Sequence, residues 1–258
     1  MNASKGEIEI NYLSEGSGPP VTLVHGVGAN LGSWDAIAAR LARRYRVIRM
    51  DLRGHGKSSR IETCSLGDFL NDVTVVLDTL GVARTHLVGF SLGGMIAQAF
   101  VLAHPERVEK LALISALAGR TPEERANVQA RARKVREEGI ASVVAAAEER
   151  WFTYAFRQKH PDVVAKRLEE LKANDHRSYS AAYTVFAEGD LGSRLHGIRQ
   201  PTLIVTGEHD VGSNTRMARF MHEAIQGSTL NILPGLKHSV LLEAPEQIAS
   251  LLEDFLSQ

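Results

Sequence analysis

A short run of small residues, Gly89-Phe90-Ser91-Leu92-Gly93-Gly94, separates two stretches of different character. Residues 85–89 before it are β-prone, and residues 95–103 after it have the composition of a helix. A strand that turns this sharply into a helix needs glycine, because neighbouring backbones come too close for a Cβ atom. The run therefore predicts a strand, a tight turn and a helix, which is the repeating unit of α/β folds.

The same alternation recurs along most of the chain. The predicted strands span residues 21–25, 46–51, 85–89, 108–115, 201–206 and 229–233, and the predicted helices lie around 36–44, 69–80, 92–103 and 245–256. Strands that alternate with helices form a parallel sheet covered on both faces. In such a sheet the functional loops lie at the carboxyl ends of the strands.

Residues 118–196 interrupt this alternation. They are rich in Ala, Glu and Arg, and they predict helices at 122–138, 140–152, 161–174 and 179–188 without a strand between them. We therefore expect an α/β fold whose doubly wound, mostly parallel core comes from residues 1–117 and 197–258. Residues 118–196 would form a helical insert between two core strands.

The composition of the chain limits which binding partners and which cellular compartment are expected. The 258 residues include 30 Lys and Arg against 30 Asp and Glu, so no attraction to nucleic acid is expected. No apolar run approaches the ~20 residues that a membrane helix needs, and the N-terminus shows no secretory signal. The single cysteine, Cys64, excludes an intrachain disulfide and fits a reducing compartment. We expect a cytoplasmic protein whose Cys64 is an ordinary packed thiol.

Ser91 stands at the top of the predicted turn, where its hydroxyl would project into a cavity. A serine hydroxyl needs a base and an orienting carboxylate to act as a nucleophile at neutral pH. Asp210 directly follows the strand at 201–206, and His238 follows the strand at 229–233. The chain order of serine, acid and histidine is the one that a nucleophile elbow requires. His209 and Glu208 are the weaker alternatives for base and acid.

Attack by such a serine also needs donors for an oxyanion. The backbone amide of Leu92 follows the serine, and the loop His25-Gly26-Val27-Gly28 follows the first predicted strand, so we expect the amides of Leu92 and Val27 to supply them. That loop lacks a full dinucleotide fingerprint, and residues 51–59 lack the spacing of a phosphate-binding loop. The histidines and acids show no metal-ligand spacing. We expect neither a cofactor nor a metal.

These segments together resemble the α/β-hydrolase superfamily over nearly the whole chain. The matching segments are His25 to Gly28, Asp51 to Ser58, Gly89 to Gly94, Gly207 to Asp210, and His238. The resemblance implies that residues 118–196 are the family's helical cap, which roofs the active site. Ser91 separates the chain from haloalkane dehalogenases and epoxide hydrolases, which carry Asp at this position.

A narrower resemblance lies in the cap. The segments Glu149-Arg150-Trp151-Phe152-Thr153 and Tyr179-Ser180-Ala181-Ala182-Tyr183 are similar to the cap motifs of 3-oxoadipate enol-lactonases. The resemblance implies hydrolysis of an enol-lactone in aromatic-compound catabolism, with Arg150 binding the substrate carboxylate and Trp151 facing the cavity. Residues 211–214 lack the proline common in these lactonases, and the loop at 234–238 also differs, so the substrate stays open.

The sequence thus predicts a cofactor-free serine hydrolase whose partner is a small ester or lactone. His238 would deprotonate Ser91, and Asp210 would stabilise the imidazolium. Three alternatives remain: a broad carboxylesterase, a carbon–carbon bond hydrolase for ring-cleavage products, and a non-catalytic receptor for small molecules. The second often carries Met where this chain has Leu92. The sequence leaves a homodimer open and gives no sign of a membrane partner.

Overall fold

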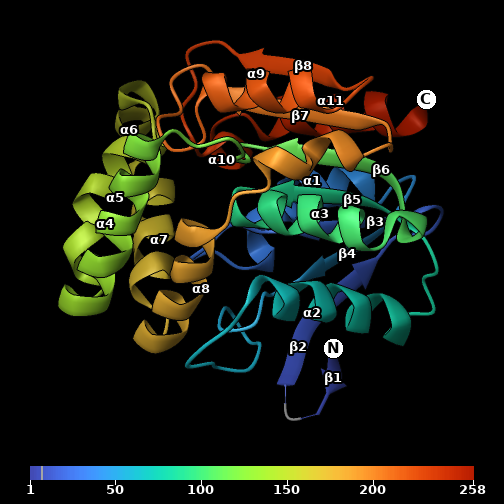
Figure 1. The fold of residues 1–258 in the computed structure, drawn as a ribbon, viewed down its shortest axis with the longest axis horizontal. Coiled ribbons are helices and arrows are strands. Elements are labelled where there is room, and N and C mark those ends of the chain that lie inside the picture. Colours follow the sequence, from blue (N-terminus) through green and yellow to red (C-terminus); the bar gives the residue numbers. More distant parts are fainter. Residues whose placement is uncertain (7) are drawn as a thin grey trace.

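A central sheet organises the molecule, which a computed structural model describes for residues 1–6 and 8–258 (Figure 1). Within these residues the sheet has eight strands in the order β1-β2-β4-β3-β5-β6-β7-β8. The strands are β1 Asn2–Lys5, β2 Ile8–Glu15, β3 Pro20–Val24, β4 Arg46–Met50, β5 Thr85–Phe90, β6 Val108–Ile114, β7 Thr202–Gly207 and β8 Thr229–Leu233. From β4 to β8 every neighbouring pair is parallel, whereas β1 and β2 are antiparallel to their neighbours. The predicted mostly parallel α/β sheet is therefore confirmed.

The two N-terminal strands were not predicted. In β2 apolar side chains alternate with polar ones, and only Ile10 and Tyr12 are buried. This period of two is typical of a strand with one covered face. Here the segment has so few apolar residues that the period is weak in the sequence. Its pairing with β4 is a tertiary contact, with Tyr12 opposite Met50.

Helices cover both faces of the sheet (Figure 1). The helices that flank the sheet are α1 Asp35–Leu41, α2 Leu66–Thr79, α3 Leu92–Ala103, α9 Thr215–Ala224, α10 Val240–Glu243 and α11 Pro245–Ser257, the last two of which follow β8. Side chains of α2, α3 and α9 pack in one core cluster, and those of α1, α10 and α11 in another. Two successive residues of the central strand β5 belong to different clusters. Leu87 packs in the first cluster, and Val88 packs in the second. The strand is therefore buried on both faces, as a central parallel strand must be.

Five further helices lie beyond β6 and are called the cap helices below. They are α4 Pro122–Glu138, α5 Val144–Trp151, α6 Tyr154–Lys159, α7 Pro161–Lys172 and α8 His176–Glu188. Figure 1 shows them gathered at one end of the sheet. Capping explains their starts: Thr121 and Glu124 form a capping box at α4, and the Asp175 side chain accepts from the Ser178 amide at α8.

The structure differs from the predicted helices in detail. The single helix predicted at 140–152 is a 3₁₀ turn, Ile140–Val143, followed by α5. Helices α6 and α9 were not predicted; the first has six residues, too few for a clear period, and begins at the side-chain cap Thr153. Among the described residues, no helix combines the length and apolarity needed to cross a membrane.

Candidate active site

Ser91 occupies a strained position between β5 and α3. Its backbone angles are φ 53° and ψ −114°, and the residue is 3% exposed. Left-handed backbone is rare for residues other than glycine and marks a site held by its surroundings. A Cβ atom on Gly89 would lie 2.2 Å from the carbonyl oxygen of Gly93. A Cβ on Gly93 would meet the carbonyl oxygen of Val24 at 2.2 Å, so this turn can be built only with glycine at both places.

The backbone amides of Leu92 and Val27 lie next to Ser91, and neither donates a hydrogen bond within the described residues. Leu92 is the first residue of α3, and its amide accordingly makes no intrahelical bond. The loop of Val27 approaches closely, since a Cβ on Gly26 would lie 3.1 Å from the Cβ of Ser91. His25 fixes this loop: its Nδ1 bonds the Gly26 carbonyl oxygen at 2.7 Å.

Asp210 and His238 form a hydrogen-bonded pair. Nδ1 of His238 lies 2.7 Å from Oδ2 of Asp210, and Asp210 is 3% exposed. The other carboxylate oxygen, Oδ1, accepts from the amides of Gly212 at 2.8 Å and Ser213 at 2.9 Å. These bonds fix the carboxylate and with it the orientation of the imidazole. The structure thus brings together two residues that lie 28 positions apart in the sequence.

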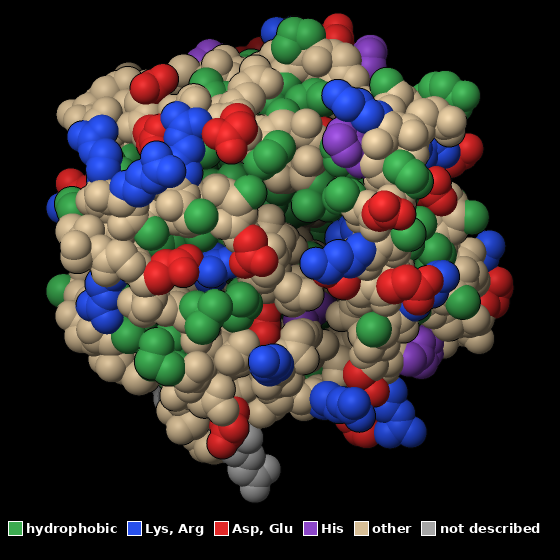
Figure 2. All heavy atoms as spheres, turned by 180° about the vertical axis from the view of Figure 1, so that it is seen from behind, with side chains coloured by type: hydrophobic (Ala, Val, Ile, Leu, Met, Phe, Trp, Pro, Cys, Tyr) green, Lys and Arg blue, Asp and Glu red, His purple; other side chains and the backbone are tan. Residues whose placement is uncertain are grey.

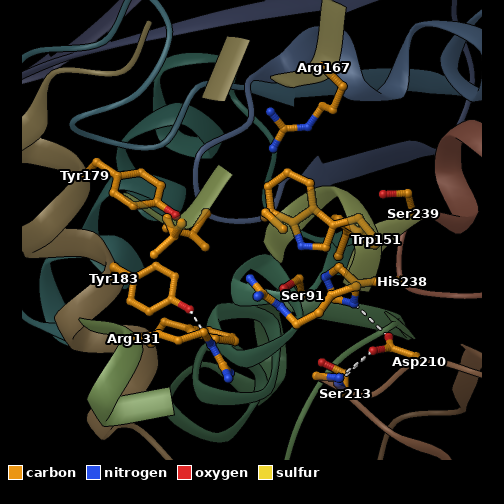
Figure 3. Close-up of a pocket in the computed structure, with 18 residues that line it drawn as sticks. Ser91, Arg131, Trp151, Arg167, Tyr179, Tyr183, Asp210, Ser213, His238 and Ser239 are labelled. Atoms are coloured by element: carbon orange, nitrogen blue, oxygen red, sulfur yellow. Dashed lines mark hydrogen bonds and ion pairs between the residues drawn. The ribbon is translucent and has the colours of Figure 1, made fainter. Parts of the chain in front are cut away.

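The imidazole of His238 and the hydroxyl of Ser91 face one cavity (Figure 3). The ring of Phe90, beside the serine, lies 5.1 Å from the His238 ring, centroid to centroid. Ser91 and His238 make no hydrogen bond with each other in the described structure. Catalytic hydrogen bonds are commonly long in the absence of a substrate and shorten in the complex.

The weaker alternatives for base and acid lie outside this cavity. The His209 side chain is 59% exposed and faces Glu208, with 3.8 Å between Nε2 and Oε2. Glu208 instead accepts a hydrogen bond from the Gly235 amide. Residues 51–59 form a structural loop, in which the Asp51 carboxylate accepts from the amides of Leu31 and Lys57. Part of this loop lines a separate hollow.

The cavity lies between the sheet and the cap helices and measures about 70 Å³. Space of this size holds a small molecule rather than a polymer. Arg150 and Trp151, at the end of α5, line it. Two further arginines, Arg131 of α4 and Arg167 of α7, also line it and were not predicted.

A sequence signal exists for Arg167 alone. The apolar stripe of α7, Val164, Leu168 and Leu171, is interrupted at the buried position that Arg167 occupies. A charged residue on a buried stripe is unusual and indicates either a buried ion pair or a functional site. Arg131 gives no such signal, because α4 is polar around most of its circumference.

The cavity carries an excess of positive charge. Burial, followed by the nearby Arg131, lowers the pKa of Arg150, and burial lowers that of Arg167. Guanidinium groups nevertheless stay protonated in proteins. Within the described residues none of the three arginines has a carboxylate within ion-pair distance. Asp210 is the one carboxylate in the cavity lining, and hydrogen bonds occupy both of its oxygens.

Aromatic side chains complete the lining. The indole of Trp151 lies under the guanidinium of Arg167, 4.8 Å from its carbon atom to the ring centroid. The Tyr183 hydroxyl accepts from Nε of Arg131 at 3.3 Å, and burial raises the pKa of Tyr179. Tyr179 therefore stays neutral at physiological pH and offers a hydroxyl group rather than a charge.

No group of metal-ligating side chains occurs among the described residues. Cys64 lies away from the cavity, partly buried against the core. Burial raises the pKa of its thiol to about 12, so it is a poor nucleophile. This agrees with the expectation of an ordinary packed thiol.

Comparison with known proteins gives consistent matches. The family described as alpha/beta hydrolase fold matches residues 19–245. 3-Oxoadipate enol-lactonase 1 of Acinetobacter baylyi is 29% identical over 237 residues, which cover 92% of this chain and 88% of the relative. The (E)-2-((N-methylformamido)methylene)succinate hydrolase of the same organism is 28% identical over 251 residues, 95% of this chain and 93% of the relative. The crystal structure of the enol-lactonase from Burkholderia xenovorans LB400 has a TM-score of 0.94 at 28% identity, with 100% of both chains covered.

Proposed function

Because the chain belongs to the alpha/beta hydrolase fold family, we propose that it hydrolyses a small lactone or ester that carries a carboxylate. The reaction would proceed at Ser91, without a cofactor. The observation that carries this proposal is one cavity that holds a strained serine, a histidine–aspartate pair and arginines without ion partners.

His238 acts as the base. Its Nδ1 is bound to Asp210, so Nε2 is free to take the proton of Ser91 as the hydroxyl oxygen attacks the substrate carbonyl. Asp210 stabilises the imidazolium, which then protonates the leaving oxygen. Water repeats the sequence on the acyl-enzyme and releases the acid.

The amides of Leu92 and Val27 hold the oxyanion. Both lie beside Ser91 and have no other acceptor in the described structure, so no competing bond must be broken. Donors fixed in advance stabilise the charge that develops in the transition state without further reorganisation. The dipole at the N-terminus of α3 acts in the same direction.

Arg150 binds the carboxylate of the substrate. A half-buried guanidinium without a counter-ion among the described residues is costly, and a planar carboxylate matches its geometry. Trp151 covers the apolar part of a small ligand. The relatives named for an enol-lactone and for a substituted succinate agree with a small carboxylate substrate. We therefore favour an enol-lactone of aromatic-compound catabolism, whose enol oxygen leaves easily.

One matched pair of substrates tests this proposal: an enol-lactone with a carboxymethyl side chain, and its neutral carboxamide. Ser91→Ala should abolish turnover of both while circular dichroism shows an intact fold. Arg150→Gln should raise KM for the carboxylate by roughly tenfold or more and leave the carboxamide little changed. Arg157→Gln is the control, because this arginine pairs with Glu148 away from the cavity. Turnover that survives in Ser91→Ala would exclude the mechanism.

A further inference from the structure

Arg167 is the most deeply buried of the three arginines that line the cavity. The residue is 9% exposed, and its Nη1 atom is buried without a hydrogen-bond partner in the described structure. No carboxylate lies within ion-pair distance of it there. Glu170, on the next turn of α7, acts on Arg167 only through its electrostatic field. A buried cationic nitrogen left in this state costs free energy unless something else satisfies it.

Arg167 lies at the end of the cavity opposite Arg131. Figure 3 shows the two guanidinium groups far apart, with Trp151 and Ser91 in the region between them. The charge of Arg131 also acts on Arg150, whose pKa burial and this charge lower. The guanidinium groups of Arg131 and Arg167 therefore bring positive charge to two separate places in the cavity (Figure 3).

The indole of Trp151 satisfies Arg167 only in part. A ring face 4.8 Å away attracts the cation but accepts no hydrogen bond in the plane of the guanidinium. That plane, where Nη1 has no partner, is where a carboxylate binds with two parallel hydrogen bonds. The stacked indole of Trp151 holds the guanidinium group of Arg167 in a fixed orientation for such a ligand.

There is also room for a ligand group beside Arg167. Arg167, Phe90 and Ser239 line both the catalytic cavity and an adjoining cavity of about 190 Å³ between α7, α10 and the 3₁₀ turn Leu31–Trp34. Figure 2 shows this side of the molecule, which is hollowed where the cap helices meet the core. A group bound at Arg167 can therefore extend past the catalytic cavity without a clash.

We propose that Arg167 is a second anion-binding group, so that the substrate carries two carboxylates besides the bond that is hydrolysed. One carboxylate lies at Arg150 and the other at Arg167, both of which line the cavity that holds Ser91. This inference rests on the proposed function, which it deepens from a carboxylate-bearing substrate to a dicarboxylate one. Arg150 and Arg167 each bring one positive charge to the cavity lining, which matches two carboxylates.

Binding to the Ser91→Ala protein tests this inference without any need for turnover. Three methyl esters differ only in the number of carboxylates: methyl pentanoate has none, monomethyl glutarate one, and the 1-monomethyl ester of propane-1,2,3-tricarboxylate two. Calorimetry should show about tenfold tighter binding for each carboxylate added. Arg167→Gln should remove the second gain and keep the first, whereas Arg150→Gln should remove the first.

Lys172→Gln is the matched control, because it removes an exposed positive charge from the same helix at a residue that lines neither cavity. The second gain should persist in it, and Arg167→Lys should retain part of that gain. Binding of monomethyl glutarate to Arg167→Gln shows that this variant is folded. Equal affinity for the one- and two-carboxylate esters, or a second gain that survives in Arg167→Gln, would overturn the inference. Failure of the proposed function would appear separately, as wild-type protein that hydrolyses none of the lactones.

Discussion

The backbone amide of Ser239 donates a hydrogen bond of 2.9 Å to the carbonyl oxygen of Trp151. This bond joins the residue after His238 to the end of α5, which carries Arg150. A second connection lies close by, where the Glu243 carboxylate accepts from the amide of Thr153 at 2.9 Å and from its hydroxyl at 2.6 Å. The loop of the candidate base and the candidate substrate-binding segment are thus held as one unit.

Removal of the Glu243 carboxylate should loosen this unit. In Glu243→Ala the two bonds to Thr153 are lost, so α6 loses support at its first turn and Arg150 is less well positioned. We expect KM for the carboxylate lactone to rise about threefold to tenfold, from roughly 1 kcal/mol of lost hydrogen bonding. Steady-state kinetics provide the measurement. Glu246→Ala removes an exposed carboxylate that pairs with Arg40, and its KM should match wild type.

Asp210→Asn should reduce kcat strongly while substrate binding changes little. An amide at this position cannot stabilise the imidazolium and can favour the wrong tautomer of His238. The expected loss is about 10⁴-fold in kcat, with KM within a few-fold of wild type. Glu208→Gln changes the neighbouring carboxylate, which lies outside the cavity, and should keep full activity. The reverse pattern would make Glu208 the functional acid.

Gly93→Ala should destabilise the protein far more than a glycine substitution elsewhere. A Cβ at Gly93 would lie 2.2 Å from a backbone oxygen, so either the turn at Ser91 or strand β3 must move. We expect a loss of about 3 kcal/mol or more in unfolding free energy, measured by urea denaturation. Gly67→Ala is the control, because the new Cβ meets only the Ser65 hydroxyl at 3.6 Å. Inside α2 that change should be neutral or stabilising by up to about 1 kcal/mol.

Asp190 joins the two segments that lead into and out of the cap helices. Its carboxylate accepts from the amides of Gly119 at 2.8 Å, Arg120 at 2.8 Å and Gly192 at 2.9 Å. Asp190→Ala leaves these donors without the acceptor, which we expect to cost about 3 kcal/mol of unfolding free energy. Chemical denaturation measures the loss. Asp162→Ala, on an exposed part of α7, should change stability by less than about 1 kcal/mol.

Acidification should destabilise the protein through its buried histidines. Burial lowers the pKa of His55 to about 3, and it also lowers the pKa of His25. Below the ordinary value of about 6.5 the unfolded chain gains a proton that the folded chain does not, so stability is present above pH 6.5 and is lost as pH falls. With its folded-state pKa about 3, His55 alone removes about 2 kcal/mol of unfolding free energy between pH 7 and pH 5, and His25 acts in the same direction.

Denaturation at several pH values in wild type and His55→Asn measures this effect. The variant should lose less stability over the same range, whatever its stability at pH 7. His209→Asn replaces an exposed histidine and should keep the wild-type slope. Parallel pH profiles for wild type and His55→Asn would show that His55 does not contribute.

Local sequence patterns predicted the core of the fold. The strands around Leu87 and Ile204 are short β-prone segments with an apolar centre, and their alternation with helices is typical of parallel strands covered on both faces. Ser91, Asp210 and His238 could be selected because each directly follows a predicted strand. The parallel topology then brings the ends of those strands to one edge of the sheet, and all three side chains line one cavity.

Other features depend on contacts between distant segments, and no local pattern contains them. Strand β2 is defined by its pairing with β4, and Arg131 reaches the cavity only because α4 packs against α8. The two charged ends of the cavity follow from the way α4, α5 and α7 surround it.

The sequence by itself determined the alternating α/β core and the strand ends at which reactive side chains stand, because backbone preference and hydrophobic period act over a few neighbouring residues. The tertiary structure alone decided which arginines share the cavity, and it leaves all three without a carboxylate in ion-pair distance among the described residues. Burial and ion pairing are properties of the packed assembly, and they depend on residues that lie far apart in the chain.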